Sequence, residues 1–184
     1  MHCFIRSLIF FILGFYSLPV FSGQQSFLLK TQIELLPSCL INDQKVISDQ
    51  VFNFGQINFG EVAASFNGVI EGQLHQVNAP GSGIKIWCSS HAPVKLTFDG
   101  GRHRQNIPSD FAANYFRALS NGKDYLAYNL LYGAKKQVLK SSEIITIPND
   151  GKVFDLELSG QVTNNGHPVS IGQYTDTVSI LIEF

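Results

Sequence analysis

The stretch DTVSILIEF, residues 176–184, alternates between apolar and polar side chains, and this pattern constrains the fold more than any other feature. Side chains at every second position share one face of a β-strand, so the stretch predicts a strand with one buried face. The apolar side chains on that face are Val178, Ile180, Ile182 and Phe184. A buried strand has a neighbour on each side, and no further strand follows Phe184 in this sequence. We therefore expect another segment to cover this edge.

Composition limits the number of domains and the class of partner. The 184 residues are 45% apolar, 12% aromatic and 15% charged, which suits one hydrophobic core of ordinary size and not two. Glycine is frequent, whereas methionine and tryptophan occur once each, and this balance favours sheet and turns over helices. The formal net charge of −1 gives no attraction for nucleic acid, which we do not expect as a partner.

Short alternating segments, separated by Asn-Gly, Pro-Gly and Gly-Gly turn signals, continue through the chain. The further candidate strands are KVISDQVFNFG, GIKIWCSS, PVKLTF, DYLAYNLLYG, EIITIP and KVFDLELSGQV. About seven strands without a long helical period predict an all-β sandwich. DFAANYFRALSNG is expected to form a turn or two of helix at most.

Residues 1–22 have the layout of a secretory signal peptide. A positively charged start precedes an apolar run, residues 8–16, which is too short to span a bilayer as a permanent helix. Val20 and Ser22 fit the pattern before a cleavage site, so we expect cleavage after Ser22, with Gly23 as the neighbouring option. An uncleaved membrane anchor is the alternative. We expect the mature protein to be exported.

Removal of the signal peptide also removes Cys3 and leaves Cys39 and Cys88 as a pair. An even pair of cysteines in an oxidising compartment predicts one disulfide. Closing a loop of about 50 residues stabilises a fold by roughly 4 kcal/mol in the chain-entropy model. The alternatives are a zinc site, which would need further ligands nearby, and two free thiols, which rarely persist outside the cytoplasm.

Residues 27–35, FLLKTQIEL, form a second amphipathic strand pattern near the start of the mature chain. One face carries Phe27, Leu29, Thr31, Ile33 and Leu35, and the other face carries Lys30, Gln32 and Glu34. This strand and the C-terminal strand both lack an evident partner inside one sandwich. An exposed apolar groove would promote aggregation, so each strand is expected to find a partner.

Positively charged residues gather in GRHRQN, which invites comparison with an anion or metal site. The candidate residues are Arg102, His103 and Arg104, together with the histidines His75, His91 and His167. Their spacings match no ligand motif, so the group is interpreted as a solvated loop. We expect neither a metal nor a cofactor.

The sequence contains no recognised catalytic arrangement. Asp155 and Glu157 alternate with apolar residues and are interpreted as the solvent-facing side of a strand, not as an acid/base pair. There is no GxSxG motif to present a nucleophile and no glycine-rich loop to bind phosphate. The protein is therefore not expected to be an enzyme.

Several stretches together resemble a known family in their order and spacing. They are Cys39 directly after an amphipathic strand, FNFGQINFG, IKIWC with Cys88, PVKLTFDGG, RALSNGKDYLAYNLLYG and GQYTDTVSILIEF. The most specific parts are Arg117 followed by the Tyr128-Asn129-Leu130-Leu131-Tyr132 run, and Gly172-x-Tyr174-x-Asp176 before the last strand. These stretches resemble the spore coat protein U domain, whose family includes the pilin subunits of archaic, Csu-type chaperone–usher pili. EGQLHQVNAPGSG and GGRHRQNIPSDFAANYF are longer than the loops of that family.

The resemblance implies an incomplete immunoglobulin-like β-sandwich, residues 39–184, that lacks its last strand and is completed by a donor strand from another chain. A periplasmic pilus chaperone is expected to fill the open groove first, and residues 23–38 of a sister pilin subunit replace it at the outer-membrane usher. The expected donor residues are Phe27, Leu29, Thr31, Ile33 and Leu35, and the expected groove residues are Val178, Ile180, Ile182 and Phe184. The expected product is a fimbrium on the cell surface that supports adhesion and biofilm formation.

Two other classes of protein stay open. The first is a monomeric secreted β-sandwich that binds a ligand or coats a surface, with its own N-terminal strand folded into the groove. The second is a secreted hydrolase with an unrecognised site.

Overall fold

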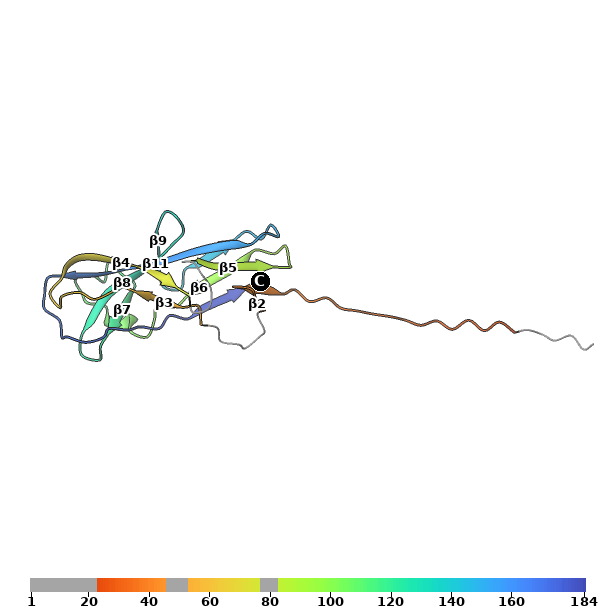
Figure 1. Ribbon diagram of the computed structural model, residues 1–184, viewed down its shortest axis with the longest axis horizontal. Helices are drawn as coiled ribbons and strands as arrows, with labels where there is room; N and C mark the ends of the chain where they lie inside the picture. The colour runs from red at the N-terminus through yellow and green to blue at the C-terminus, as the bar shows by residue number, and fades with distance from the viewer. Residues whose placement is uncertain (1–22, 46–52, 77–82) are drawn as a thin grey trace, which may run out of the picture. The chain divides into compact units, whose positions relative to one another are not determined.

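A computed structural model describes residues 23–45, 53–76 and 83–184 of the protein (Figure 1). The predicted signal peptide lies outside the described residues, as does the greater part of the predicted strand KVISDQVFNFG. Leu35–Phe184 forms one compact unit, and the segment that precedes it is described by itself below.

The compact unit is built of strands, as predicted. Within the described ranges the one helix is a short 3-10 turn, η1 (Arg104–Asn106), and no helix there has the length and hydropathy to cross a membrane. The strands are β1 (Cys39–Ile41), β2 (Gln44–Lys45), β3 (Gln56–Asn58), β4 (Asn67–His75), β5 (Gly83–Cys88), β6 (Val94–Phe98), β7 (Arg117–Ser120), β8 (Tyr125–Tyr132), β9 (Gln137–Leu139), β10 (Ile144–Ile147), β11 (Phe154–Asn165) and β12 (Ile180–Glu183).

β11 is the central strand of the larger sheet, whose order is β2-β1-β5-β11-β4-β3 (Figure 1). Its first residues pair with β5, and its second half pairs with β4 and with β8, which extends the sheet to β7 and β9. Leu156 and Leu158 on β11 are buried, whereas Asp155 and Glu157, which alternate with them, are exposed. The two carboxylates face solvent, as their alternation with apolar residues predicts.

The smaller sheet has the order β10-β6-β12, with both pairs antiparallel. β6 is its middle strand, and its alternate residues Val94, Leu96 and Phe98 are buried. They belong to one hydrophobic core with Ile84 of β5 and Tyr128 of β8, which come from the larger sheet. The two sheets therefore share a core, and the all-β, two-layer fold predicted from the sequence is confirmed.

β4 has no counterpart among the predicted strands. Along β4 only Gly72 and Leu74 are buried, and Val69 is exposed, so its apolar alternation is weak. The strand forms because long antiparallel pairing with β11, from Ser159↔Gln73 onward, satisfies its backbone groups. Tertiary pairing here outweighs the local pattern.

The helical expectation for DFAANYFRALSNG is wrong for its second half. Turns precede Tyr115, whose N–H donates to the carbonyl of Phe111 at 3.0 Å in a single helix-like turn. The chain then becomes β7, which pairs with β8 through Ala118↔Ala127. Arg117 and Ala118 are fully buried, and an extended backbone places both next to β8. Burial and strand pairing therefore determine the conformation of this stretch.

Residues 23–34 contain neither helix nor strand and are exposed along their whole length. Figure 1 draws the segment as an irregular trace in red to orange. The amphipathic strand predicted for residues 27–35 is therefore not a member of either sheet.

Candidate strand-acceptor site

β12 lies at one edge of the smaller sheet, next to the letter C in Figure 1. It pairs with β6 through Ile180↔Phe98 and Ile182↔Leu96, and within the described part of the chain no strand pairs with its outer edge. The carbonyl of Ser179 accepts a 3.0 Å hydrogen bond from the N–H of Asp99, so Ser179 directs its backbone toward β6. Backbone direction alternates along a strand, and Ile180 and Ile182 therefore present their N–H and C=O groups to the free edge.

The inner face of this strand is only partly covered. Val178, Ile180 and Ile182 pack against the hydrophobic core but remain half-buried, whereas Leu96 and Phe98 on the neighbouring β6 are each only 1% exposed. A strand in the middle of a complete sheet has its inner face fully buried. The half-buried row next to unpaired backbone groups is therefore a candidate acceptor for a further strand.

The regular strand is shorter than predicted. β12 begins at Ile180, so Val178 shares the alternating burial but lies before the assigned strand. Phe184 is 40% exposed and is not part of the core-packing group, although its position in the alternation matches that of Ile182. Leu181, on the opposite face, is 59% exposed. Of the four predicted groove residues, the structure thus brings three together on the core and leaves the fourth more open.

The position of β12 depends on residues 166–179, the crossing segment, which leads from β11 in the larger sheet to β12 in the smaller sheet. Thr175 and Ser120 of β7 exchange backbone hydrogen bonds of 3.0 and 2.9 Å. One residue later, Asp176 accepts a 2.8 Å bond from the hydroxyl of Tyr128 and a 2.8 Å bond from the N–H of Arg102. These contacts fix the chain a few residues before Ile180 and so align the acceptor edge.

A second set of side chains holds the start of the same crossing segment. Asp124 accepts a 2.7 Å hydrogen bond from the N–H of Ser170. Asn121 donates to the Ser170 hydroxyl at 2.8 Å, and the Tyr174 hydroxyl donates to the Ser170 carbonyl at 2.9 Å. The pKa of Asp124 is lowered, first by hydrogen bonding from the side chain of Ser170 and then by the bond from its backbone N–H. The crossing segment is therefore fastened at both ends.

Arg117 lies at the centre of the polar contacts beneath this segment. Its side chain is fully buried, and it donates from Nε and Nη2 to the carbonyl of Asp99 at 3.0 and 2.7 Å and from Nη1 to the carbonyl of Leu139 at 2.7 Å. Burial lowers the pKa of Arg117, and the nearby Tyr128, Asp99 and Asp176 act in the opposite direction. The guanidinium therefore joins β7 to the last residue of β9 and to the residue that follows β6 through their backbone carbonyl groups.

Tyr128 is the buried partner of the same network. Its pKa is raised, first by burial and then by the negative charge and hydrogen bond of Asp176. Its ring packs edge-on against Phe59, with centroids 6.3 Å apart. The hydroxyl therefore stays protonated and donates to the carboxylate.

The residues predicted to form a donor strand are all exposed to solvent. Phe27, Leu29, Ile33 and Leu35 are exposed, with Ile33 at 83%, and Thr31 is exposed as well. Their alternation with polar residues is that of a strand with one apolar face, yet the segment belongs to neither sheet.

The predicted disulfide is present. Cys39 of β1 and Cys88 of β5 are directly opposite each other in an antiparallel pair, with their Cα atoms 4.0 Å apart, and both are buried. The bond ties the first strand of the larger sheet to its neighbour immediately after the exposed N-terminal segment. Cys39 is therefore a fixed point from which that segment departs.

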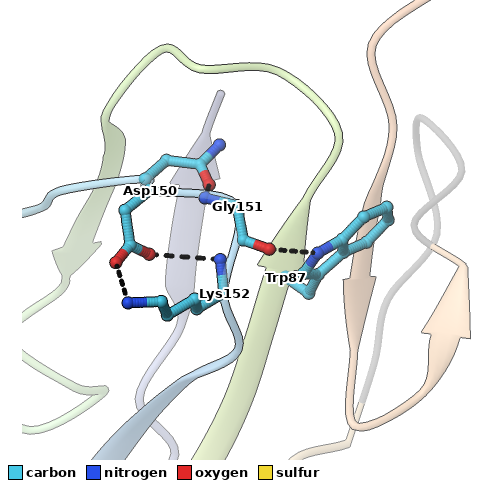
Figure 2. A network of polar contacts seen from close by, with 5 residues as sticks. Trp87, Asp150, Gly151 and Lys152 are labelled. Carbon is cyan, nitrogen blue, oxygen red and sulfur yellow. Dashed lines mark hydrogen bonds and ion pairs between the residues drawn. The ribbon is translucent and has the colours of Figure 1, made fainter.

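The end of β5 is also held by a turn before β11, shown in Figure 2. Trp87 donates from its indole nitrogen to the carbonyl of Gly151 at 3.0 Å, and Asn149 donates to the carbonyl of Cys88 at 3.3 Å. Asp150 accepts from the N–H of Lys152 at 3.1 Å, which is the main cause of its lowered pKa, and forms a 3.4 Å ion pair with the same residue. The turn therefore supports the disulfide-bonded strands.

The structure does not assemble the other candidate ligands into a site. Arg102 and Arg104 are exposed, and His103 lies beside the ring of Tyr125 with centroids 5.9 Å apart. In residues 23–45, 53–76 and 83–184, no three histidine, cysteine or acidic side chains gather as they would around a metal ion. Arg102 takes part in the crossing contacts only through its backbone N–H.

Sequence reasoning identified Arg117, Tyr128 and Asp176 as motif residues but not the contacts between them. It missed Asp99, whose carbonyl accepts from Arg117 and whose Oδ1 accepts from the N–H of Ser179 at 3.0 Å. The available signal was the Asp-Gly-Gly turn after PVKLTF, because aspartate often accepts from backbone N–H groups in turns. Nothing local in the sequence indicates that this turn meets the segment before β12.

These features define a class of protein: a two-sheet, all-β domain with one disulfide and a C-terminal strand whose outer edge has no partner in the described chain. The model of the Spore Coat Protein U domain matches residues 25–181. The chain therefore belongs to the Spore Coat Protein U domain family, as the resemblance of its motifs predicted. None of the curated proteins compared with the chain matches it.

The solved structures that are similar to the chain include the following two. One is the CsuC–CsuE chaperone–tip adhesion subunit pre-assembly complex from archaic chaperone-usher Csu pili of Acinetobacter baumannii, with 20% identity over 82% of this chain and a TM-score of 0.41. The similarity spans only 40% of that protein's chain. The other is a chaperone-usher pilus, with 16% identity over 90% of this chain and 98% of that chain and a TM-score of 0.49.

Proposed function

We propose that the protein is a structural subunit of a surface pilus, assembled by the chaperone–usher route through donor-strand complementation. One observation supports the proposal: the chain combines a strand that has an open edge with an exposed segment that has a strand-like apolar alternation. Among the described residues, β12 has a free edge and a half-buried apolar row, and residues 27–35 are exposed, with apolar side chains at every second position except Thr31. Each offers what the other lacks.

The energetics favour joining the open edge and the exposed segment in a strand-exchange joint. Backbone N–H and C=O groups at Ile180 and Ile182 would gain partners, and the donor side chains would cover the half-buried row. Full burial of an exposed Phe, Leu or Ile side chain is worth roughly 1.5–3 kcal/mol, so several donor residues together would hold the subunits firmly. The exposed fractions of Phe27, Leu29 and Ile33 support this estimate.

The proposal includes the partners and the location that the family resemblance implies. A periplasmic pilus chaperone covers the free edge of β12 after export, and an outer-membrane usher exchanges it for the N-terminal segment of a sister subunit. The assembled fimbrium lies on the cell surface and supports adhesion and biofilm formation. The protein has a structural role in this scheme and needs no cofactor.

The test is the behaviour of the secreted protein on a denaturing gel. Without boiling, subunits joined by donor strands run as a ladder of polymers, and boiling reduces the ladder to a monomer. Deletion of the chaperone gene removes the ladder and the surface fibres together. A monomer in the unboiled sample, with undiminished export in the deletion strain, would instead support a self-complemented secreted sandwich and overturn the proposal.

A further inference from the structure

We propose that Lys30 of one copy and Glu183 of a second copy set the register of the joint, with the donor segment antiparallel to β12 and Lys30 directly opposite Glu183. This inference rests on the proposed function and goes beyond it, because it fixes the direction and the alignment of the donor. Both residues are exposed, and neither forms an ion pair within the described structure. Lys95 of β6, although opposite Glu183 in the sheet, does not reach it within 4.0 Å.

The backbone of β12 restricts the possible registers. Ile180 and Ile182 direct their side chains to the core and their free backbone groups to the outer edge, as the Ser179–Asp99 hydrogen bond shows. Residues directly opposite each other in a ladder have their side chains on the same face. An apolar donor residue must therefore stand opposite an even-numbered residue of β12, and only every second register satisfies this condition.

In the antiparallel register with Lys30 opposite Glu183, every donor residue of the apolar face from Leu29 to Leu35 stands opposite a residue on the core-facing side of the C-terminal strand. This register aligns Leu29 with Phe184, Thr31 with Ile182, Ile33 with Ile180 and Leu35 with Val178. All four predicted groove residues then receive a donor residue, and Phe27 lies one step beyond Leu29. On the outer face, Gln32 stands opposite Leu181 and Glu34 stands opposite Ser179, so no like charges meet.

The competing alignments lose either the charge pair or the apolar contacts. A parallel donor with the same Lys30–Glu183 pair places Leu29 opposite Ile182 but carries Ile33 past Phe184, away from the half-buried row. An antiparallel shift by two residues in one direction places Lys30 opposite Leu181, and the opposite shift places Gln32 opposite Glu183. Each shift preserves the apolar face, so the charge pair is what distinguishes the three antiparallel registers.

Cysteine pairs on the outer face test the register in the assembled, full-length protein. The matched variants are Gln32→Cys/Leu181→Cys, Gln32→Cys/Ser179→Cys and Gln32→Cys/Glu183→Cys. In the proposed register Gln32 and Leu181 form a non-hydrogen-bonded pair, because the backbone N–H and C=O of Leu181 point toward β6. The Cα atoms of such a pair are about 4.5 Å apart, which suits a disulfide. We expect the Leu181→Cys variant to give a ladder that survives boiling and collapses on reduction, and the other two to give little of it.

The outcomes separate this inference from the proposed function. Polymers that are seen in the unboiled sample but are cross-linked mainly in the Ser179→Cys or Glu183→Cys variant would overturn the proposed register, while the proposal of strand exchange would stand. Polymers that cross-link through none of the three would exclude an antiparallel donor of this alignment. A disulfide formed inside a monomer, without any polymer, would overturn both.

Charge reversal supplies an independent measurement. An exposed ion pair changes an equilibrium by roughly two- to five-fold. Lys30→Glu is therefore expected to lower the yield of the Gln32–Leu181 cross-link relative to the Gln32–Ser179 cross-link by that factor, and Glu183→Lys in addition is expected to restore it. An unchanged ratio in the single variant would show that Lys30 and Glu183 do not determine the register.

Discussion

The hydroxyl of Tyr128 donates a 2.8 Å hydrogen bond to Oδ2 of Asp176 and so joins β8 of the larger sheet to the segment that leads into β12 of the smaller sheet. The same carboxylate accepts from the N–H of Arg102. A Cβ atom at Gly101 would collide with this carboxylate, and the φ of +74° at Gly101 also favours glycine. The acceptor edge is therefore aligned by a part-buried contact between Asp176, shortly before β12, and Tyr128, which is far from β12 in sequence.

Replacement of Tyr128 by Phe removes only the hydroxyl and leaves the carboxylate of Asp176 without its buried donor. The free energy of unfolding is expected to fall by about 1–2 kcal/mol, measured by urea denaturation. Tyr125→Phe is the matched control, because no hydrogen bond of the Tyr125 hydroxyl occurs in the described structure and the ring is retained. Equal stability of Tyr128→Phe and wild type would show that the contact does not hold the crossing segment.

The raised pKa of Tyr128 predicts a loss of stability in alkaline solution. Because the folded protein keeps the phenol protonated and the unfolded chain ionises near its usual pKa of about 10, the stabilisation is complete below that pH and is lost as the pH rises above it. Unfolding free energies measured from pH 8 to 11 should decline more steeply for wild type than for Tyr128→Phe. Parallel curves for the two proteins would contradict this assignment.

Arg117→Lys tests the buried guanidinium. A lysine cannot reach the carbonyls of Asp99 and Leu139 with the same planar set of donors, and its charge is more readily lost on burial. We expect a loss of about 2–4 kcal/mol in the free energy of unfolding, from the charged hydrogen bonds that are removed. Arg104→Lys, at an exposed position, should leave it unchanged. A similar small effect for both variants would show that Arg117 mainly fills space.

The sequence predicted most strands of the fold because their side chains alternate clearly. β6 and β8 are examples, since burial of every second or nearly every residue leaves a strong pattern. β4 was not predicted because its stability comes from pairing with β11 on one edge and with β3 on the other, and not from its own apolar residues. The strands pack so closely that a Cβ atom at Gly72 would collide with the backbone of Asn58. Close backbone packing of this kind leaves no periodic signal.

The candidate site could be predicted only in part for a similar reason. The apolar alternation of Ile180 and Ile182 is visible in the sequence, and so is that of Ile33. The contacts that position the site are backbone acceptors, such as the carbonyl of Asp99 for Arg117, and any residue type supplies a carbonyl. The free edge of β12 is likewise a property of the sheet order and not of any residue in the strand.

Ile33→Asp tests the donor segment, with Gln32→Asp as the matched control one position away. In the proposed joint Ile33 enters the groove and Gln32 faces solvent, so only the first variant buries an unpaired charge, at a cost of several kcal/mol. The polymer ladder should disappear in Ile33→Asp and persist in Gln32→Asp. Both side chains are exposed in the single chain, so the monomer and its chaperone complex should be unaffected in both. Normal fibres from Ile33→Asp would contradict the donor role.

Ile180→Asp tests the acceptor edge in the same paired way, with Leu181→Asp on the opposite, solvent-facing side of β12 as its control. A charge at position 180 would be buried under the chaperone's strand, whereas a charge at position 181 would stay in water. Only Ile180→Asp is therefore expected to reduce co-purification with the chaperone. The reduction should be at least ten-fold, because burial of the charge costs several kcal/mol. Truncation before Ile180 removes the edge itself and should abolish capture altogether. Formation of the Cys39–Cys88 disulfide in the exported chain reports whether each variant has folded. A disulfide-bonded Ile180→Asp protein that co-purifies with its chaperone as well as Leu181→Asp does would place the acceptor edge elsewhere.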